Sequence, residues 1–182
     1  MNTEPSQAAA VVEFWRESGP QRWFRKDPAF DAEFRGRFLA LHERAAAGEL
    51  DDWATRSEGA LALLILLDQF PRNAFRGTAR MYATDARARR IAHAALERQL
   101  DSEVPQELRN FMYLPQMHSE DPKDQELSVS KTAALGGESH RYALHHQGVI
   151  RSFGRFPHRN ALLGRTSTAQ EEQFMAEGGF DG

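Results

Sequence analysis

Apolar residues recur along most of this chain at spacings of three and four, which place them on one face of an α-helix. The clearest case lies between Asp27 and Gly48, where the apolar positions are Phe30, Phe34, Phe38, Leu41 and Ala45. No segment alternates apolar and polar residues convincingly over the length of a strand. The pattern therefore predicts an all-α protein.

Cap and turn residues divide this pattern into about eight helices. Asp27 before a proline is a typical helix start, and Thr168 with Glu171 predicts a capping box for the last helix. Pro71 predicts the end of a helix near Phe70, because proline has no backbone N–H. We expect helices to cover, approximately, residues 7–17, 28–47, 51–70, 85–100, 105–115, 122–135, 139–153 and 168–176.

The most apolar helix is expected at the centre of the protein. Residues 60–67 are apolar on every side, which is the pattern of a helix that is covered all round. This run is much shorter than the ~20 residues that a bilayer requires. The N-terminus also lacks the basic-then-apolar order of a secretory signal. We therefore predict a cytoplasmic protein without a membrane partner.

Length and composition favour one globular domain. A chain of 182 residues can bury one sizeable core, and its 41% hydrophobic and 27% charged residues are typical of globular proteins. We predict a single domain over residues 1–182, with residues 1–5 and 178–182 frayed. The net charge of −3 and the pI near 6.2 argue against nucleic acid as a partner.

The absence of cysteine limits the chemistry that the chain can perform. Disulfides, thiolate zinc sites and cysteine nucleophiles are excluded, and a metal would need histidine and carboxylate ligands. His118, Glu120, His146 and His158 are imaginable ligands, but they lack the usual i, i+4 or His-Glu-x-x-His spacings. We therefore expect neither a metal nor a cofactor.

One segment is rich in cations and contains no carboxylate. It lies between Glu138 and Glu171 and holds Arg141, Arg151, Arg155, Arg159 and Arg165 with His140, His145, His146 and His158. A local positive field is therefore expected in a chain of negative net charge. Within the segment, residues 156–160 (Phe-Pro-His-Arg-Asn) echo residues 70–73 (Phe-Pro-Arg-Asn).

Three motifs extend along the chain in a fixed order. They are Leu-Leu-Asp-Gln-Phe-Pro-Arg-Asn at 66–73, His-Ser-Glu-Asp at 118–121, and Phe-Gly-Arg-Phe-Pro-His-Arg-Asn at 153–160 with Leu-Gly-Arg at 163–165. By these motifs the chain resembles the bacterial family called domain of unknown function 924. The resemblance implies a tetratricopeptide-like stack of antiparallel helical hairpins and a site at the motifs, but it implies no reaction.

Asp68 is expected near the C-terminal end of the apolar helix, where the helix dipole disfavours a carboxylate. A buried Asp68 therefore needs a cation, which Arg72, Arg155 or Arg159 could supply. The structural interpretation is a network of ion pairs that joins helix ends. The functional interpretation is a pocket wall that holds an anion.

The motif side chains have the chemistry of anion binding. Arginine offers a planar fork to carboxylates and phosphates, and asparagine adds directional donors. We expect ligand binding by Arg72, Asn73, Arg155, Arg159, Asn160 and Arg165. His118 and His158, with Asp68, are candidate catalytic residues, because histidine titrates near neutral pH. For the His118 motif, an ordinary capped helix start at residues 119–121 is the alternative.

The sequence therefore predicts a site for a small anionic molecule where the two Phe-Pro/Arg-Asn segments meet the His118 loop, with His118 or His158 moving protons if there is a reaction. The alternative from another class is a helical-repeat scaffold that binds a peptide or partner protein in a concave groove. A third interpretation is that every motif is architectural.

Overall fold

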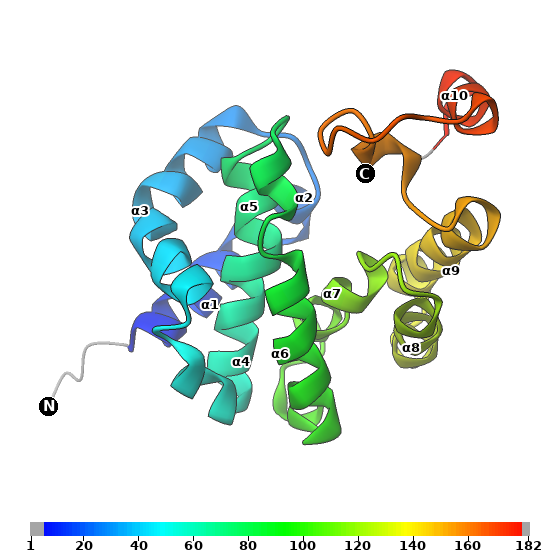
Figure 1. Cartoon of the computed structure of the whole chain (residues 1–182). Helices are drawn as coiled ribbons and strands as arrows, with labels where there is room; N and C mark the ends of the chain where they lie inside the picture. Colours follow the sequence, from blue (N-terminus) through cyan, green and yellow to red (C-terminus); the bar gives the residue numbers. More distant parts are fainter. Residues whose placement is uncertain (1–5, 180–182) are drawn as a thin grey trace, which may run out of the picture. The chain divides into compact units, whose positions relative to one another are not determined.

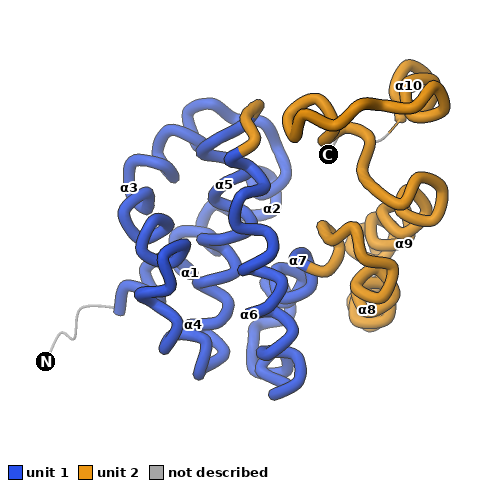
Figure 2. The backbone as a smooth tube through the Cα atoms, in the orientation of Figure 1, with its two compact units in different colours: residues 1–76, 80–115 blue, residues 77–79, 116–182 orange. Residues whose placement is uncertain are grey.

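The computed structural model describes residues 6–179, and every regular element in this range is helical (Figure 1). The predicted all-α class is confirmed. The chain divides into two compact units, residues 1–76 with 80–115 (unit 1) and residues 77–79 with 116–182 (unit 2) (Figure 2). The single domain and the tetratricopeptide-like hairpin stack stay predictions. Of the residues expected to fray, 1–5 and 180–182 lie outside the described range.

Unit 1 consists of helices joined by brief turns. Its α-helices are α1 (Gln7–Ser18), α2 (Pro20–Trp23), α3 (Pro28–Ala47), α4 (Ser57–Leu64), α5 (Phe70–Ala74) and α6 (Asp85–Glu97). Its 3-10 helices are η1 (Asp51–Thr55), η3 (Ala79–Tyr82), η4 (Leu100–Glu103) and η5 (Arg109–Met112), and η2 (Ile65–Gln69) is a π-helical turn. Both η3 and α7 (Leu114–Met117) cross a boundary between the two sets of residues.

The core of unit 1 is the column formed by α4, η2 and α5, against which α1, α3 and α6 pack (Figure 1). Residues 60–67 are all buried, as their apolar pattern predicts. Aromatic rings fill the space beside the column, and the Phe34 ring centre lies 5.2 Å from Trp15 and 5.1 Å from Phe70. Within the described range, no helix is both long and apolar enough to cross a bilayer.

Pro71 does not end the central helix, which contradicts the prediction from the sequence. The helix passes through the π-helical turn η2 and continues as α5 to Ala74. In this turn the Phe70 N–H donates to the carbonyl of Ile65, five residues earlier. The wider turn accommodates a proline where a regular helix would lose a hydrogen bond and meet a steric clash.

Side chains from neighbouring helices replace the bond that Pro71 cannot make. The Leu66 carbonyl accepts a hydrogen bond from His42 Nδ1–H of α3, at 2.9 Å. The Leu67 carbonyl accepts one from the hydroxyl of Thr84, at 2.5 Å. Buried carbonyl groups need such partners. The π-helical turn thus depends on residues that are 17 or more positions away in the sequence.

Other element boundaries also differ from the sequence prediction. Residues 51–55 form the 3-10 helix η1, and α4 begins only at Ser57. The helix expected over residues 105–115 is replaced by η5 and α7, so that Pro115 lies inside a helix. Trp23, which lies outside the predicted helices, is the last residue of α2. Short 3-10 turns at helix ends leave little trace in hydrophobic periodicity, and the sequence pattern therefore missed them.

Unit 2 contains α8 (Pro122–Ala133), α9 (Gly137–Phe153), η6 (Pro157–Arg159) and α10 (Ala169–Ala176). Helices α8 and α9 pack side by side (Figure 1). Gly154 has a φ of 70°, a left-handed conformation that favours glycine, and the chain leaves α9 there. The buried centre of unit 2 is formed by Val149, Ile150 and Phe156, with Phe153 and Phe174 packed against them.

The predicted helix starts at Asp27 and Thr168 are both confirmed. The Asp27 carboxylate accepts from the N–H groups of Ala29 and Phe30. The Thr168 hydroxyl accepts from the Glu171 N–H, and the Glu171 carboxylate accepts from the Thr168 N–H in return. The last helix is therefore fixed by the capping box that the sequence indicated.

Replacing Thr168 with alanine is expected to lower the free energy of unfolding by about 1 kcal/mol, because the N-cap oxygen is lost. Thr166 is the matched control, since it contributes only its backbone carbonyl to the hydrogen bonds found in the described part of the chain. Urea denaturation of T168A and T166A measures both effects. Equal losses in the two variants would contradict the capping role.

Candidate functional site

Asp68 pairs with Arg72, one turn further along the central column of unit 1. Arg72 Nη1 lies 3.2 Å from an Asp68 oxygen, and Asp85 accepts from both Nη groups at 2.8 and 2.9 Å. Asp68 is 1% exposed, and its second oxygen accepts from Gln69 Nε2 at 2.6 Å. Burial alone would lower the pKa of Arg72, but the charges of Asp68 and Asp85 raise it. Arg72 is thus the cation that a buried Asp68 requires.

Asn73 also contacts a carboxylate within unit 1. Its Nδ2 donates to Asp31 at 2.7 Å, and the Arg76 guanidinium donates to both Asp31 oxygens at 3.0 and 3.2 Å. The first Phe-Pro-Arg-Asn segment therefore joins the end of the central column to α3 through Asp31 and to the start of α6 through Asp85. These contacts are those of the ion-pair network in the structural interpretation.

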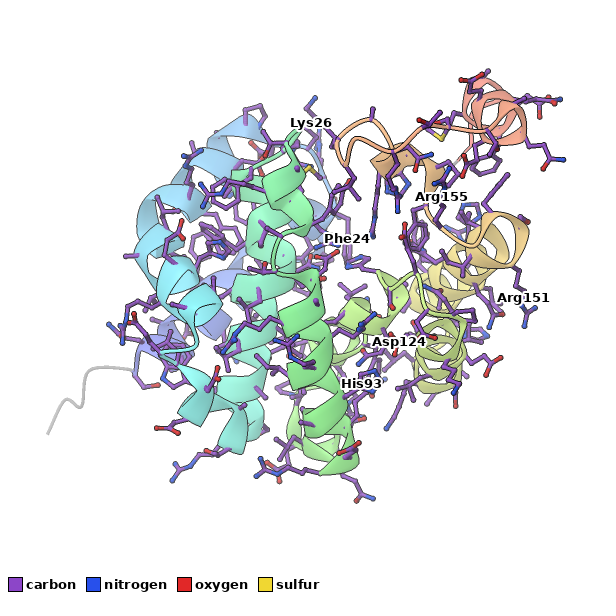
Figure 3. All side chains as sticks on the ribbon, viewed as in Figure 1. Phe24, Lys26, His93, Asp124, Arg151 and Arg155 are labelled. Carbon is purple, nitrogen blue, oxygen red and sulfur yellow. The ribbon has the colours of Figure 1, made fainter. Side chains whose placement is uncertain are left out.

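In unit 2, Arg155 and Asn160 both contact Glu171. Arg155 donates to the two Glu171 oxygens at 2.6 and 2.7 Å and to the Thr166 carbonyl at 2.8 Å. Asn160 Nδ2 lies 3.1 Å from Ser167 Oγ and 3.3 Å from a Glu171 oxygen. The hydrogen bonds from Arg155 hold the pKa of Glu171 at about 2, against the opposing effect of burial. Figure 3 labels Arg155 just beyond the end of α9.

Arg165 and Glu120 form a second ion pair in unit 2. Arg165 donates to both Glu120 oxygens at 2.7 and 3.0 Å and to the Phe156 carbonyl at 3.0 Å, while Glu120 accepts the Phe156 N–H at 2.8 Å. Burial alone would raise the pKa of Glu120, but the bonds from Arg165 and Phe156 lower it. Glu120 therefore fixes the loop before η6. Asp121, the last residue of the His-Ser-Glu-Asp motif, caps α8 by accepting from the Lys123 N–H at 2.9 Å.

Two histidines and one arginine lie close to the ring of Phe156, and a third histidine, His118, lies close to one of them. We call the set His118, His146, Phe156, His158 and Arg159 the Phe156 cluster. The ring centres of His146 and His158 each lie 5.6 Å from that of Phe156, and the His118 ring lies 6.0 Å from His146. The Arg159 guanidinium lies 4.5 Å from the Phe156 ring centre, within cation–π distance. Phe156 is fully buried and Arg159 is 7% exposed.

His146 stays neutral in this environment at neutral pH. Burial, followed by the charges of His118, His145 and Arg159, lowers its pKa to about 3. Its Nδ1–H donates to the Tyr142 carbonyl at 2.7 Å, which also defines its tautomer. The Phe156 cluster therefore combines a permanent cation, Arg159, with a histidine that resists protonation. This arrangement can attract an anion and still provide a neutral imidazole.

The predicted site residues belong to two groups. Asp68, Arg72 and Asn73 lie in unit 1; His118, Arg155, His158, Arg159, Asn160 and Arg165 lie in unit 2. A pocket shared by both Phe-Pro/Arg-Asn segments stays a prediction. His146 is the cluster member that the sequence prediction did not place in the anion site, and it is 6% exposed.

The described residues include no side-chain arrangement that suits a metal ion, and one small hollow of unit 2 lies away from the predicted site residues. No group of three or more histidine and acidic side chains among residues 6–179 is arranged to hold a metal ion. A hollow of about 40 Å³ between α8 and α9 has room for only a few water molecules. It is lined by Pro122, Gln125, Glu126, Gln147, Ile150 and Arg151, none of which is a predicted site residue.

Comparison with known proteins agrees with this helical fold. Over residues 11–179 the chain matches the family model described as bacterial protein of unknown function, DUF924. It is 48% identical to the solved protein of unknown function ATU0120 from Agrobacterium tumefaciens, with a TM-score of 0.92 over 93% of this chain and 97% of that chain. No curated protein matches the chain.

Proposed function

Since the chain belongs to DUF924, a family of bacterial proteins of unknown function, its activity has to be inferred from its own side chains, and we propose that it binds a small anionic molecule at the Phe156 cluster of unit 2. The observation that carries the proposal is a buried guanidinium, Arg159, next to a buried aromatic ring that two imidazoles also approach, with a third imidazole beside one of them. Carboxylates and phosphates are the anions that a guanidinium recognises best.

The geometry around Phe156 supports this assignment. A guanidinium close to an aromatic ring gains cation–π attraction and presents its N–H donors at its edge, where they can bind two oxygens of one anion. His118 and His158 supply further donors, because a histidine near neutral pH can give a proton or a hydrogen bond. The positive charge of Arg159 already acts on its surroundings, since it contributes to the lowered pKa of both Glu120 and His146.

The remaining predicted residues have positioning roles in this proposal. Arg155 and Asn160 hold α10 through Glu171, and Arg165 holds the loop before η6 through Glu120. Their donors are directed at protein carboxylates, so they set the position of Arg159 rather than contact the anion. The Arg159 segment is thus fastened on both sides by ion pairs. If a reaction follows binding, His118 or His158 moves the proton.

Isothermal titration with inorganic phosphate and with citrate tests the proposal on the full chain. Replacing Arg159 with glutamine is expected to weaken binding of the responding anion by about tenfold or more, because charge-assisted hydrogen bonds are lost. Arg159→Lys is expected to fall between wild type and R159Q, because lysine keeps the charge but lacks the planar fork. Circular dichroism establishes that each variant is folded.

Arg151→Gln is the matched control, because Arg151 is an exposed arginine on α9 (Figure 3). It is expected to bind both anions as the wild type does. The proposal fails if neither anion binds saturably, or if R159Q binds as tightly as R151Q. Capture of a peptide or partner protein that is indifferent to R159Q would favour the scaffold alternative instead.

A further inference from the structure

A second hollow lies within unit 1, far in the sequence from the Phe156 cluster. Its volume is about 270 Å³, near the lower limit of small-molecule sites. It is bounded by the end of α1, by α2 and by the first half of α3. The lining residues are Phe14, Glu17, Ser18, Arg22, Phe30, Glu33 and Arg37. Neither the sequence motifs nor the proposed anion site includes any of them.

The apolar part of this hollow is the small exposed surface of two stacked rings, since Phe14 is 8% exposed and Phe30 is 2% exposed. The Phe14 and Phe30 ring centres are 5.6 Å apart, with an angle of 4° between the ring planes. The guanidinium of Arg37 lies 5.1 Å from the Phe14 ring centre, and that of Arg22 lies 6.0 Å from the Phe30 ring centre. Both rings are anchored by the aromatic core of unit 1, because Phe14 also stacks on Phe34 at 5.3 Å.

The charged part of the hollow contains two carboxylates and two guanidiniums. Glu33 and Arg37 form an i, i+4 ion pair at 3.6 Å. For Glu17 and Arg22, by contrast, no side-chain hydrogen bond or ion pair is found with any residue in the described range. One open carboxylate and one open guanidinium therefore line the same space. Elsewhere on α1, Glu13 and Arg16 do pair, at 3.3 Å.

We propose that this hollow binds a small zwitterion of the α-amino acid class. Its ammonium group would bind the Glu17 carboxylate, its carboxylate would bind the Arg22 guanidinium, and its side chain would lie against the Phe14 and Phe30 rings. The two carboxylates and two guanidiniums of the lining sum to no net charge, which favours a neutral zwitterion over an anion or a cation. A ligand with only a positive or only a negative charge would pair with one of these two groups and leave the other without a partner.

The test uses L-phenylalanine and two analogues that each lack one charge. In 3-phenylpropanoate the ammonium group is missing, and in 2-phenylethylamine the carboxylate is missing. Binding to the full chain is measured by ligand-observed saturation-transfer NMR and titration. L-phenylalanine is expected to bind best, and both analogues are expected to bind about tenfold more weakly, because each loses one charge-assisted contact.

Variants assign each charge to a residue. Arg22→Gln is expected to weaken the binding of L-phenylalanine about tenfold and to leave the binding of 2-phenylethylamine unchanged. Glu17→Gln is expected to weaken the binding of L-phenylalanine to a similar extent and to leave the binding of 3-phenylpropanoate unchanged. Arg16→Gln and Glu13→Gln are the matched controls on the same helix and are expected to bind all three probes as the wild type does.

Three results would overturn the proposal: no saturable binding of L-phenylalanine, equal binding of all three probes, or binding unaffected by both R22Q and E17Q. Because all four substituted residues are exposed, loss of folding is not the expected outcome of any of these variants. The R159Q variant should retain L-phenylalanine binding in full. Failure of the anion site and failure of the zwitterion site are therefore separate results.

Discussion

Replacing Arg72 with methionine is expected to lower the free energy of unfolding by about 3–5 kcal/mol, because the buried Asp68 loses the guanidinium that pairs with it. Asp68 is 1% exposed, so water cannot take the place of that cation. Asp85 loses the two hydrogen bonds that it accepts from Arg72 as well. Urea denaturation at neutral pH measures the change.

Two further variants show whether the loss comes from a buried charge. The double variant D68N/R72M is expected to recover the part of the loss that comes from Asp68, because no uncompensated charge is then left at that buried position. Asp85 still lacks Arg72 in this variant, but its side chain is 20% exposed and water can reach it. R76M is the matched control, since Arg76 also pairs with an aspartate but is partly exposed. Its cost is expected to stay below about 1 kcal/mol. If R72M lowers the free energy of unfolding no more than R76M does, the buried-charge explanation is contradicted.

The same R72M protein separates the interpretations of the first Phe-Pro-Arg-Asn segment. The structural interpretation predicts that a folded R72M binds phosphate and citrate as the wild type does. A role for Arg72 in holding the anion predicts weaker binding by the folded variant. Titration at a temperature well below its unfolding transition gives the answer without interference from lost stability.

Lowering the pH from 7 to 5 is expected to destabilise the protein, and His146 alone should account for roughly 2 kcal/mol of that loss. The folded pKa of His146 is about 3, below its ordinary value of 6.5, because the residue is buried and faces other cationic groups. Its contribution to stability is therefore complete above pH 6.5. It is lost as the pH falls toward 3, since only the unfolded chain then takes up the proton.

His146→Phe is expected to remove this share of the pH dependence while keeping a ring packed against Phe156. Residues 142 and 146 both lie within α9, so the Tyr142 carbonyl keeps the N–H of residue 146 as its donor in the regular i to i+4 pattern of the helix. Burial also lowers the pKa of His42, so part of the fall in stability between pH 7 and pH 5 should remain in H146F. Unfolding free energies at pH 7 and pH 5 are compared for wild type and H146F. An identical fall in wild type and H146F would show that His146 is not responsible.

The predictions from the sequence were accurate where the structure depends on contacts between residues close together in the chain or on strong hydrophobicity. Asp27 and Thr168 were expected as N-caps and are N-caps, because the bonds that they form are local. Residues 60–67 were expected to be buried on all sides and are buried, because exposing any face of such an apolar helix to water costs free energy. Asp68 was expected to need a cation, and Arg72, four residues on, is close enough to supply it by helix geometry alone.

The helix boundary at Pro71 shows why other features were beyond the sequence. A proline normally ends a helix, but here His42 and Thr84 supply the donors that its missing N–H would have provided. The two residues are distant in the chain, so no local pattern marks them. The Phe156 cluster has the same origin, because His118, His146 and Arg159 come from different elements.

The sequence by itself thus determined the helical class, the central buried helix, the N-caps at Asp27 and Thr168 and the kinds of side chain available for anion recognition, since these follow from local periodicity and residue chemistry. Only the tertiary structure decided which carboxylate each arginine meets. Asp85 and Asp31 engage the first Phe-Pro-Arg-Asn segment, while Glu171 and Glu120 engage Arg155 and Arg165. Ion pairs form between groups that folding brings within about 4 Å, and separation along the chain carries no information on that distance.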